Sequence, residues 1–545
     1  MLCAQNLYLS IQGHDVTETQ VIDSLNYKKV FKDYKSLQKE IDSTHFRLQH
    51  LGYIENRIKK TEKINDSTFS SKFALNRKYD TIYIYTPENS FSEQELNMIS
   101  TEVSEGYFSI PISQTEEALR YLNELIIERG QPFASLKLIR LEKKDEDNLK
   151  AELQITKNKK RTIDGIVIKG YEKFPRSFLK HYLRIKKNSN FNLATIKKKT
   201  ERLNALRFAN ETRSPEVLFT RDSTTLYFYI EKVKSNTFDG FLGFGTNEET
   251  NKLEFDGYLN LNLTNSLNFG ETFNLQYKSD ENDQKTFNAQ VDTPYLFGTA
   301  IGAELGLSIF KRDSSFTTVS QNADIYYQLN SNHRIAIGIN ALQSNNLLET
   351  DAFNIQDLSS TFYTLKYQWV QPQYRNLLFP EKFKLNTALG FGQREHMNTK
   401  EDQQIFDLRA FNIFNLNLKN SIFLRLTGSG MSSSTYFENE LLRFGGINSI
   451  RGFEENSLLA SLFGVINTEY RYQLNPTIYA HSILDFGYLE NDIINSKEKL
   501  FGFGFGFGIL TKAGLLKFNY ANGKFEGQNF KLSNSKIHLS LNALF

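Results

Sequence analysis

The sequence predicts small α+β modules in the order β-α-α-β-β, followed by a 16-stranded antiparallel transmembrane β-barrel. Three observations support this fold class. Helical periodicity mixed with strands extends to about residue 234, and alternation of apolar and polar residues replaces it afterwards. In this second part, the connections alternate between short turns and long loops, which is typical of membrane barrels. The 545 residues are also too many for one compact core.

The N-terminal part divides into three blocks of similar size, with expected boundaries at residues 5–87, 88–159 and 160–235. Such a repeat indicates a string of small modules. The third block shows the plan most clearly, because one strand and two helical stretches precede a pair of strands. Its expected elements are a strand at 163–170, helices at 178–183 and 192–208, and strands at 216–220 and 224–233.

The first two blocks follow the plan less completely. In the second, Ser113 and Glu116 have the spacing of a capping box, and the helix that follows is expected to end at Gly130. Strands are expected at 133–140 and 149–156, and no first strand is evident. The alternative is one α+β domain whose blocks are similar by coincidence. The expected elements of the first block are a strand at 7–13, helices up to Gly52, and strands at 68–75 and 80–86.

The barrel is expected over residues 236–545, which gives about 19 residues per strand and connection. Tight turns are expected at Asn475-Pro476 and Lys512-Ala513, and long loops at 345–359, 395–404 and 432–458. An even number of strands places both ends of the barrel on the side of the modules. The predicted strands begin near Phe238, Leu253, Glu271, Thr286, Ala300, Thr318, Arg334, Ser360, Phe383, Ile405, Ser421, Leu459, Thr477, Lys499, Gly514 and Ser535.

Alternation assigns the faces of the strands. In the last strand Leu539, Leu541 and the terminal Phe545 share the apolar face with their neighbours at every second position. The strand LFGFGFGFGI points four phenylalanines one way and four glycines inward, and glycine in a strand often marks close approach of another backbone. A groove is therefore expected along the inner wall, lined by Gly502, Gly504, Gly506 and Gly508.

The long segment before residue 458 contains LLRFGGINSIRGF, in which Arg451 follows an apolar residue and precedes a glycine. Asp485 and Gly487 are expected to face inward beside the glycine groove, and Glu469 faces inward from the preceding strand. An Arg–carboxylate pair in the lumen would hold the segment by bidentate hydrogen bonds. The alternative is that Arg451 is solvated in an outer loop and that the glycines reflect low complexity.

These motifs resemble the BamA/TamA superfamily of outer-membrane insertases and transporters. Its lumen loop carries a tip matched by Ile450-Arg451-Gly452-Phe453, and its following strands carry patterns similar to Glu469-Tyr-Arg and Asp485-x-Gly487. The resemblance implies that the three blocks are POTRA-like modules, that loop 431–458 is inserted in the lumen, and that Phe545, Leu541 and Leu539 form a C-terminal insertion signal. A layout of three modules and sixteen strands looks most like TamA. The chain departs from the family at Ala513, where proline is usual, and in its divergent middle module.

The function that the resemblance implies is insertion or translocation of client proteins, with lipid as a further cargo class, through a seam between the first and last barrel strands. The modules would receive clients or partners in the periplasm. The expected partners are outer-membrane lipids, unfolded outer-membrane or secreted proteins, and a periplasmic or inner-membrane accessory protein. The alternative is a two-partner-type secretion pore for one dedicated exported protein. The first residues, Met1 to Gln5, resemble the end of a truncated secretory signal, against the alternative of an ordinary cytoplasmic start.

The composition favours no other function class. A net charge of +3 gives no electrostatic reason to expect nucleic acid as a partner. Cys3 is the only cysteine and no histidine cluster has metal-ligand spacing, so neither a metal nor another cofactor is expected. Ser36 and Lys39 have Ser-x-x-Lys spacing without companion motifs, and His481 near Asp485 is better explained by lumen hydrogen bonding than by catalysis. The chain is therefore not expected to be an enzyme.

Overall fold

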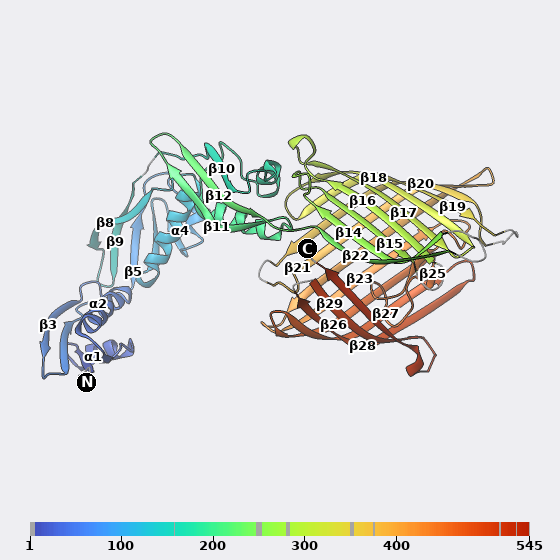
Figure 1. The fold of residues 1–545 in the computed structure, drawn as a ribbon. Helices are drawn as coiled ribbons and strands as arrows, with labels where there is room; N and C mark the ends of the chain where they lie inside the picture. Colours follow the sequence, from blue (N-terminus) through green and yellow to red (C-terminus); the bar gives the residue numbers. More distant parts are fainter. Residues whose placement is uncertain are drawn as a thin grey trace. The chain divides into compact units, whose positions relative to one another are not determined.

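The computed structural model describes residues 6–156, 159–246, 253–279, 284–348, 354–373, 376–511, 514–529 and 531–543 (Figure 1). The chain forms two compact units. One contains residues up to 163 together with 188–192, and the other contains 164–187 and the residues from 193 onward. Among the described residues, no helix is both long enough and apolar enough to cross a membrane.

The first module has a four-stranded sheet in the order β2-β1-β4-β3, in which β1 runs parallel to β4. Helix α2 buries Leu37, Ile41 and Leu48 against the sheet because they recur at near-helical spacing. Strand β3 was not predicted, since its sequence RIKKTEK is polar and lies at the sheet edge. The elements are β1 (Leu7–Gln12), α1 (Val16–Ser24), β2 (Val30–Phe31), α2 (Tyr34–His50), β3 (Arg57–Lys63) and β4 (Thr68–Ala74).

The second module begins earlier than predicted. Strand β5 (Thr81–Tyr85) was assigned to the first module, but it lies in the second sheet, between β7 and β9. Its buried Ile82 and Ile84 belong to the core of the second module. The assignment to the first module was wrong because β5 pairs in parallel with the distant β9 and antiparallel with β7. This also supplies the first strand that the sequence did not reveal.

The rest of the second module forms around β5, in the sheet order β6-β7-β5-β9-β8. The predicted capping box at Ser113 is wrong: α4 begins after a 3₁₀ turn, its N-cap Gln114 makes no side-chain cap, and a capping box forms instead at Ser92 and Glu95. The elements are α3 (Glu93–Leu96), β6 (Glu102–Ser104), β7 (Tyr107–Pro111), η1 (Ile112–Gln114), α4 (Thr115–Glu128), β8 (Ser135–Lys143) and β9 (Asn148–Thr156).

The third module has a three-stranded sheet in the order β10-β12-β11, with β10 parallel to β12. All three modules therefore place the first strand parallel to the last. The helix predicted at 192–208 is shorter, because an α-helical turn changes to 3₁₀ after Thr200. The elements are β10 (Gly165–Gly170), the π-helical η2 (Phe178–Tyr182), α5 (Leu193–Thr200), η3 (Glu201–Ala205), β11 (Ala209–Phe219) and β12 (Thr224–Lys232).

A 16-stranded sheet follows, and every neighbouring pair in it is antiparallel, as predicted (Figure 1). The sheet runs from β13 to β30, and β24 and β25 form a separate two-stranded hairpin. The barrel strands are β13 (Thr237–Thr246), β14 (Leu253–Thr264), β15 (Thr272–Ser279), β16 (Gln284–Thr293), β17 (Ile301–Arg312), β18 (Phe316–Gln328), β19 (His333–Asn346), β20 (Leu358–Pro372), β21 (Glu381–His396), β22 (Thr399–Asn415), β23 (Asn420–Ser432), β26 (Leu462–Asn475), β27 (Ile478–Asn491), β28 (Ser496–Thr511), β29 (Gly514–Phe525) and β30 (Ser535–Ala543); two 3₁₀ turns, η4 (Leu296–Gly298) and η5 (Leu532–Asn534), lie between strands.

One predicted long loop is wrong. Residues 395–404 lie almost entirely in strands, and only Met397 and Asn398, both with positive φ, turn the chain from β21 to β22. The segment is polar because these strands continue as a hairpin whose side chains pair across the ladder. Glu395 faces Lys400, for example, with an ion pair of 3.9 Å. Polarity alone therefore suggested a loop where cross-strand charge pairs stabilise a hairpin.

The strand faces follow the predicted alternation. Ile537, Leu539 and Phe505 are 64%, 70% and 58% exposed, as expected for an outward apolar face. Asp485 and Glu469 are buried on the opposite, inner face. Strands β13 and β30 end the sheet order and their Cα atoms approach within 8 Å, but in the described parts of the two strands no hydrogen-bonded ladder joins them.

Candidate functional site in the barrel lumen

The segment 431–458, called the lumen loop below, connects β23 to β26 through the inside of the barrel. Its two limbs are joined by the hairpin β24 (Leu442–Phe444) and β25 (Leu458–Ala460). The tip between these strands contains three glycines with positive φ, Gly445, Gly446 and Gly452, so its sharp turns use backbone conformations that other residues rarely adopt.

Arg451 lies at the tip and is 3% exposed. Its Nε and Nη2 donate to the two carboxylate oxygens of Asp485 at 2.8 and 2.6 Å, and its backbone N–H donates to Asp485 Oδ2 at 2.9 Å. Its Nη1 donates to Glu469. The structure thus brings Arg451 together with both carboxylates expected from the sequence, and one residue receives three hydrogen bonds from the tip.

Further charged side chains of the barrel wall surround the Arg451–Asp485 pair. Glu469 also accepts from Arg471 Nε at 2.7 Å, because residues two apart in β26 share its inner face. The Arg471 guanidinium lies over the ring of Phe423 at 3.9 Å, a cation–π geometry. Arg425 donates to Asn467 Oδ1 at 2.8 Å and to the carbonyl of Ser449 in the tip at 3.1 Å. The lumen wall therefore fixes the tip by side chains from three strands.

The glycines explain how the tip comes so close to the wall. A side chain at Gly502 would collide with the carbonyl of Arg451, and one at Gly487 would lie 3.0 Å from Ile450 Cδ1. Of the four glycines predicted to line a groove, only Gly502 meets the tip. The other three have different neighbours, namely Tyr520 for Gly504, His481 and Asn519 for Gly506, and Tyr479 for Gly508.

Sequence reasoning missed Gly523 in β29. A side chain on Gly452 would collide with the Gly523 backbone, and one on Gly523 would lie 2.6 Å from the Gly452 carbonyl. The alternation that placed Gly502 inward also applies to its ladder partner Gly523, so this residue could have been found. The two glycines allow direct contact between backbones of the tip and the wall.

The apolar residues of the tip pack on the same wall. Ile450 is fully buried in a cluster that includes Val465 and Leu500. Phe453 packs edge-on against Phe525 with ring centroids 5.5 Å apart. Glu454 pairs with Lys536 of β30 at 2.8 Å. Of the predicted insertion signal, Leu539 faces outward, the Leu541 backbone pairs with Leu516, and Phe545 lies outside the described residues.

The polar side chains of the lumen site bind the tip and one another. His481 Nε2 lies 3.0 Å from Asn519 Oδ1, so its hydrogen bond goes to the wall. No group of three or more metal-ligating side chains with suitable geometry occurs in the part of the chain that is described. Arg451, Arg471 and Arg425 outnumber the carboxylates of Glu469 and Asp485, and neighbouring amides and aromatic rings satisfy the excess guanidinium groups.

The third module contacts the turns at the module end of the barrel. Tyr171 donates to Asn268 Oδ1 at 2.6 Å and accepts from Asn265 Nδ2 at 2.8 Å, and burial raises the pKa of its phenol. Phe178 packs edge-on against Tyr295 with centroids 4.8 Å apart. Its ring also fills the space that a side chain on Gly270 would need. This module is therefore seated on the β14–β15 and β16–β17 turns.

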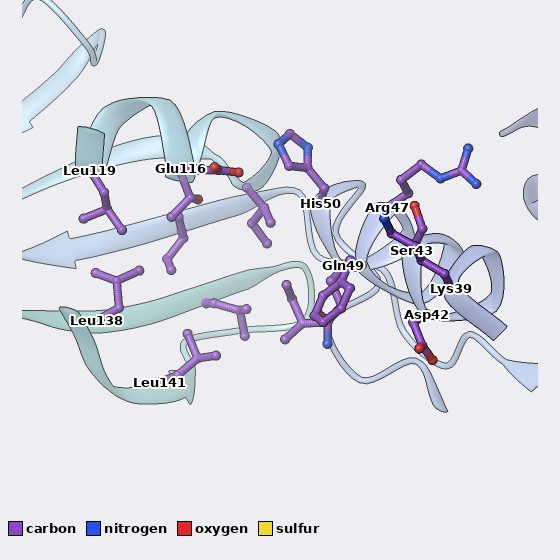
Figure 2. Close-up of a pocket in the computed structure, with 16 residues that line it drawn as sticks. Lys39, Asp42, Ser43, Arg47, Gln49, His50, Glu116, Leu119, Leu138 and Leu141 are labelled. Carbon is purple, nitrogen blue, oxygen red and sulfur yellow. The ribbon is translucent and has the colours of Figure 1, made fainter. Parts of the chain in front are cut away.

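A second candidate binding feature is an apolar groove in the first unit, with a volume of about 830 Å³. Figure 2 shows Leu119 of α4 and Leu138 of β8 facing each other across it, with Leu141 at its side. Polar residues of α2, including Lys39 and Arg47, line its other end. Because β8 is an edge strand, the groove lies next to unpaired backbone groups.

The comparisons with known proteins agree with this architecture. Residues 313–509 match the family model of the haemolysin secretion/activation proteins ShlB/FhaC/HecB, and residues 161–232 match the POTRA model, described as a surface antigen variable number repeat. The first match covers the lumen loop with Arg451, Glu469 and Asp485. No curated protein sequence matches the chain.

Solved structures share the fold at low sequence identity. CdiB from Acinetobacter baumannii is 15% identical over 90% of this chain and 95% of its own, with a TM-score of 0.50. CdiB from Escherichia coli is 12% identical over 94% of this chain and 96% of its own, also with a TM-score of 0.50. The two family matches and the shared fold support a relationship to the BamA superfamily, with a POTRA-like module before a 16-stranded barrel.

Proposed function

We propose that this protein secretes a dedicated protein partner across the outer membrane, as in two-partner secretion. The observation that carries the proposal is the match of residues 313–509 to secretion/activation proteins, since this stretch includes the lumen loop and the wall that binds its tip. Of the two functions considered from the sequence, the proposal therefore favours the two-partner-type secretion pore over a TamA-like insertion factor. The partner crosses unfolded, and the chain supplies binding and passage without a catalytic step.

The modules receive the partner in an extended form. Strands β8, β10 and β11 are sheet edges, and an extended segment can add to such an edge through main-chain hydrogen bonds. The groove beside β8 offers apolar contacts from Leu119 and Leu138 to the alternate side chains of that segment (Figure 2). Affinity would come mainly from backbone pairing and selectivity from the groove.

Passage through the barrel requires the lumen loop to move. The tip closes the lumen while Arg451 is bound to Asp485 and Glu469, and the incoming chain competes with these contacts. Breaking one side of a buried, hydrogen-bonded ion pair costs about 3–5 kcal/mol, and this cost keeps the loop in place at rest. Partner binding at the modules raises the local concentration of the competing segment, which favours displacement.

A second function, insertion of client strands into the membrane, is favoured by one observation. Strands β13 and β30 approach without a hydrogen-bonded ladder in their described residues. Gly240, Gly243 and Gly245 also leave β13 with few side chains for pairing contacts. Such a seam could open sideways and template a client strand.

One experiment separates the two functions. Pairs of cysteines are introduced across β13 and β30, in a Cys3→Ser background, and the seam is locked by oxidation. Secretion through the lumen should continue in the locked protein, and reduction should change it little. Loss of export on oxidation, with recovery on reduction, would contradict the lumen route and support insertion through the seam. The candidate partner is identified by comparing exported and surface proteins before and after depletion of this protein.

A further inference from the structure

The first limb of the lumen loop, residues 433–443, lies against a different part of the barrel wall from the tip. The tip contacts β23 and β26 to β30, whereas this limb contacts strands between β17 and β22. The sequence predicted that this limb lies in the lumen but assigned no partner to its residues. Several of its contacts are buried, since Asn439 and Glu440 of the limb are 4% and 9% exposed.

The centre of this contact is Arg394 of β21, which is 3% exposed. Its two terminal nitrogens donate to the carboxylates of Glu440 and Glu401, to the Thr435 carbonyl at 3.1 Å and to Thr435 Oγ1 at 2.6 Å. The guanidinium also lies over the ring of Phe437 at 4.5 Å. One wall residue therefore binds three residues of the limb.

The two carboxylates are satisfied by further donors. Glu440 accepts from Gln403 Nε2 at 3.1 Å and from the backbone N–H of Phe437 at 3.0 Å. Glu401 of β22 accepts from the backbone N–H of Thr435 at 2.7 Å. A buried ion pair contributes to stability only when its remaining hydrogen-bonding groups are satisfied. Here backbone N–H groups of the limb and the Gln403 amide serve both carboxylates, while Arg394 Nε has no partner among the described residues.

Three further contacts extend along the limb. Glu438 pairs with Arg312 of β17 at 2.6 Å. Asn439, which is 4% exposed, donates to Ser344 Oγ at 2.8 Å and to the Gln356 carbonyl at 2.7 Å. Arg443 lies over the rings of Phe310 and Phe316 at 5.2 and 5.1 Å. These contacts involve the neighbouring strands β17, β18 and β19, so they fix the position of the limb along the wall.

We propose that residues 435–443, centred on the Arg394–Glu440 pair, form a second anchor of the lumen loop that holds independently of the Arg451 tip. The loop then bridges two parts of the wall, β17–β22 and β23–β30. Release of the tip leaves the first limb attached, so the tip remains near its site and can return after the partner has passed. The proposal concerns how the loop is held and does not depend on the nature of the cargo.

The test uses two single-cysteine reporters in the full-length Cys3→Ser protein. Leu441→Cys reports on the first limb, because Leu441 is 5% exposed. Ser449→Cys reports on the tip, because the Ser449 hydroxyl oxygen is buried. Each reporter is combined with Glu440→Ala, with Arg451→Ala, or with the control Glu395→Ala, which removes an exposed carboxylate from the neighbouring hairpin. The rate of reaction with a bulky maleimide is then measured on the purified protein, with folding checked by heat-modifiable migration.

Glu440→Ala should speed labelling of the Leu441→Cys reporter at least about tenfold and leave the Ser449→Cys reporter protected. Arg451→Ala should do the reverse, and Glu395→Ala should change neither. Unchanged labelling of Leu441→Cys in a folded Glu440→Ala protein would overturn the second anchor. Exposure of both reporters by Glu440→Ala would overturn the independence of the two anchors. An Arg394→Lys variant, which retains the charge, should label at a rate between those of the parent and Glu440→Ala.

Discussion

Replacing Arg451 with alanine tests the role of the tip most directly. The substitution removes three side-chain hydrogen bonds and leaves Asp485, which is 0% exposed, without its guanidinium partner, while Glu469, 7% exposed, keeps only Arg471. Breaking one side of a buried pair costs about 3–5 kcal/mol. At about 1.4 kcal/mol per tenfold, the ratio of bound to released tip should fall by roughly a hundredfold or more.

The assay combines ion conductance in planar bilayers with export of the partner in cells. Arg451→Ala should raise the open fraction of the pore and lower the efficiency of export, while the barrel still inserts and shows heat-modifiable migration. Arg409→Ala is the matched control, because it removes an exposed arginine from a barrel strand. A conductance equal to that of the parent, in a protein whose Ser449→Cys reporter stays protected, would refute the reasoning that Arg451 holds the tip.

Further predictions concern the backbone contact, the third module and the groove. Gly523→Val should displace the tip, since overpacking costs about 1–3 kcal/mol, whereas Gly464→Ala, with no atom within 4 Å of its added carbon, should be silent in the same labelling assay. Phe178→Ala should destabilise the third module by about 3–5 kcal/mol and speed its proteolysis, whereas Phe297→Ala at a 99% exposed site should not. Leu138→Asp should weaken binding of the partner to the full-length protein at least about tenfold, measured by co-purification. Equal binding would argue against a role of the groove.

The barrel could be predicted from the sequence because a membrane strand must alternate, and this local rule fixes both its ends and its faces. The same rule placed Asp485, Glu469 and Gly502 on the inner wall, and the motif around Arg451 then supplied the loop that meets them. Gly523 obeys the same alternation and could have been assigned to the inner wall in the same way. The contacts among these residues could be predicted because their strands are neighbours in sequence and pair with one another.

The second anchor could not be predicted in this way. Glu401 lies in the polar stretch 395–404 that suggested a loop, and Arg394 directly precedes it; only the hairpin β21–β22 brings both to the limb of the lumen loop. In the modules, the polar β3 gave no apolar alternation, and β5 pairs with β9 across more than one helix. Both failures come from long-range pairing, which local periodicity does not encode.

The order of the tip's partners along the chain has a consequence for how the barrel assembles. Glu469, Asp485, Gly502 and Gly523 all follow Arg451 in sequence, and each lies on a different strand. The tip therefore gains its full set of contacts only after the last quarter of the wall has formed, whereas the first limb can bind β17–β22 earlier. Seating of Arg451 would then act as a late checkpoint in folding, reporting that the C-terminal strands are in register before the barrel begins to work.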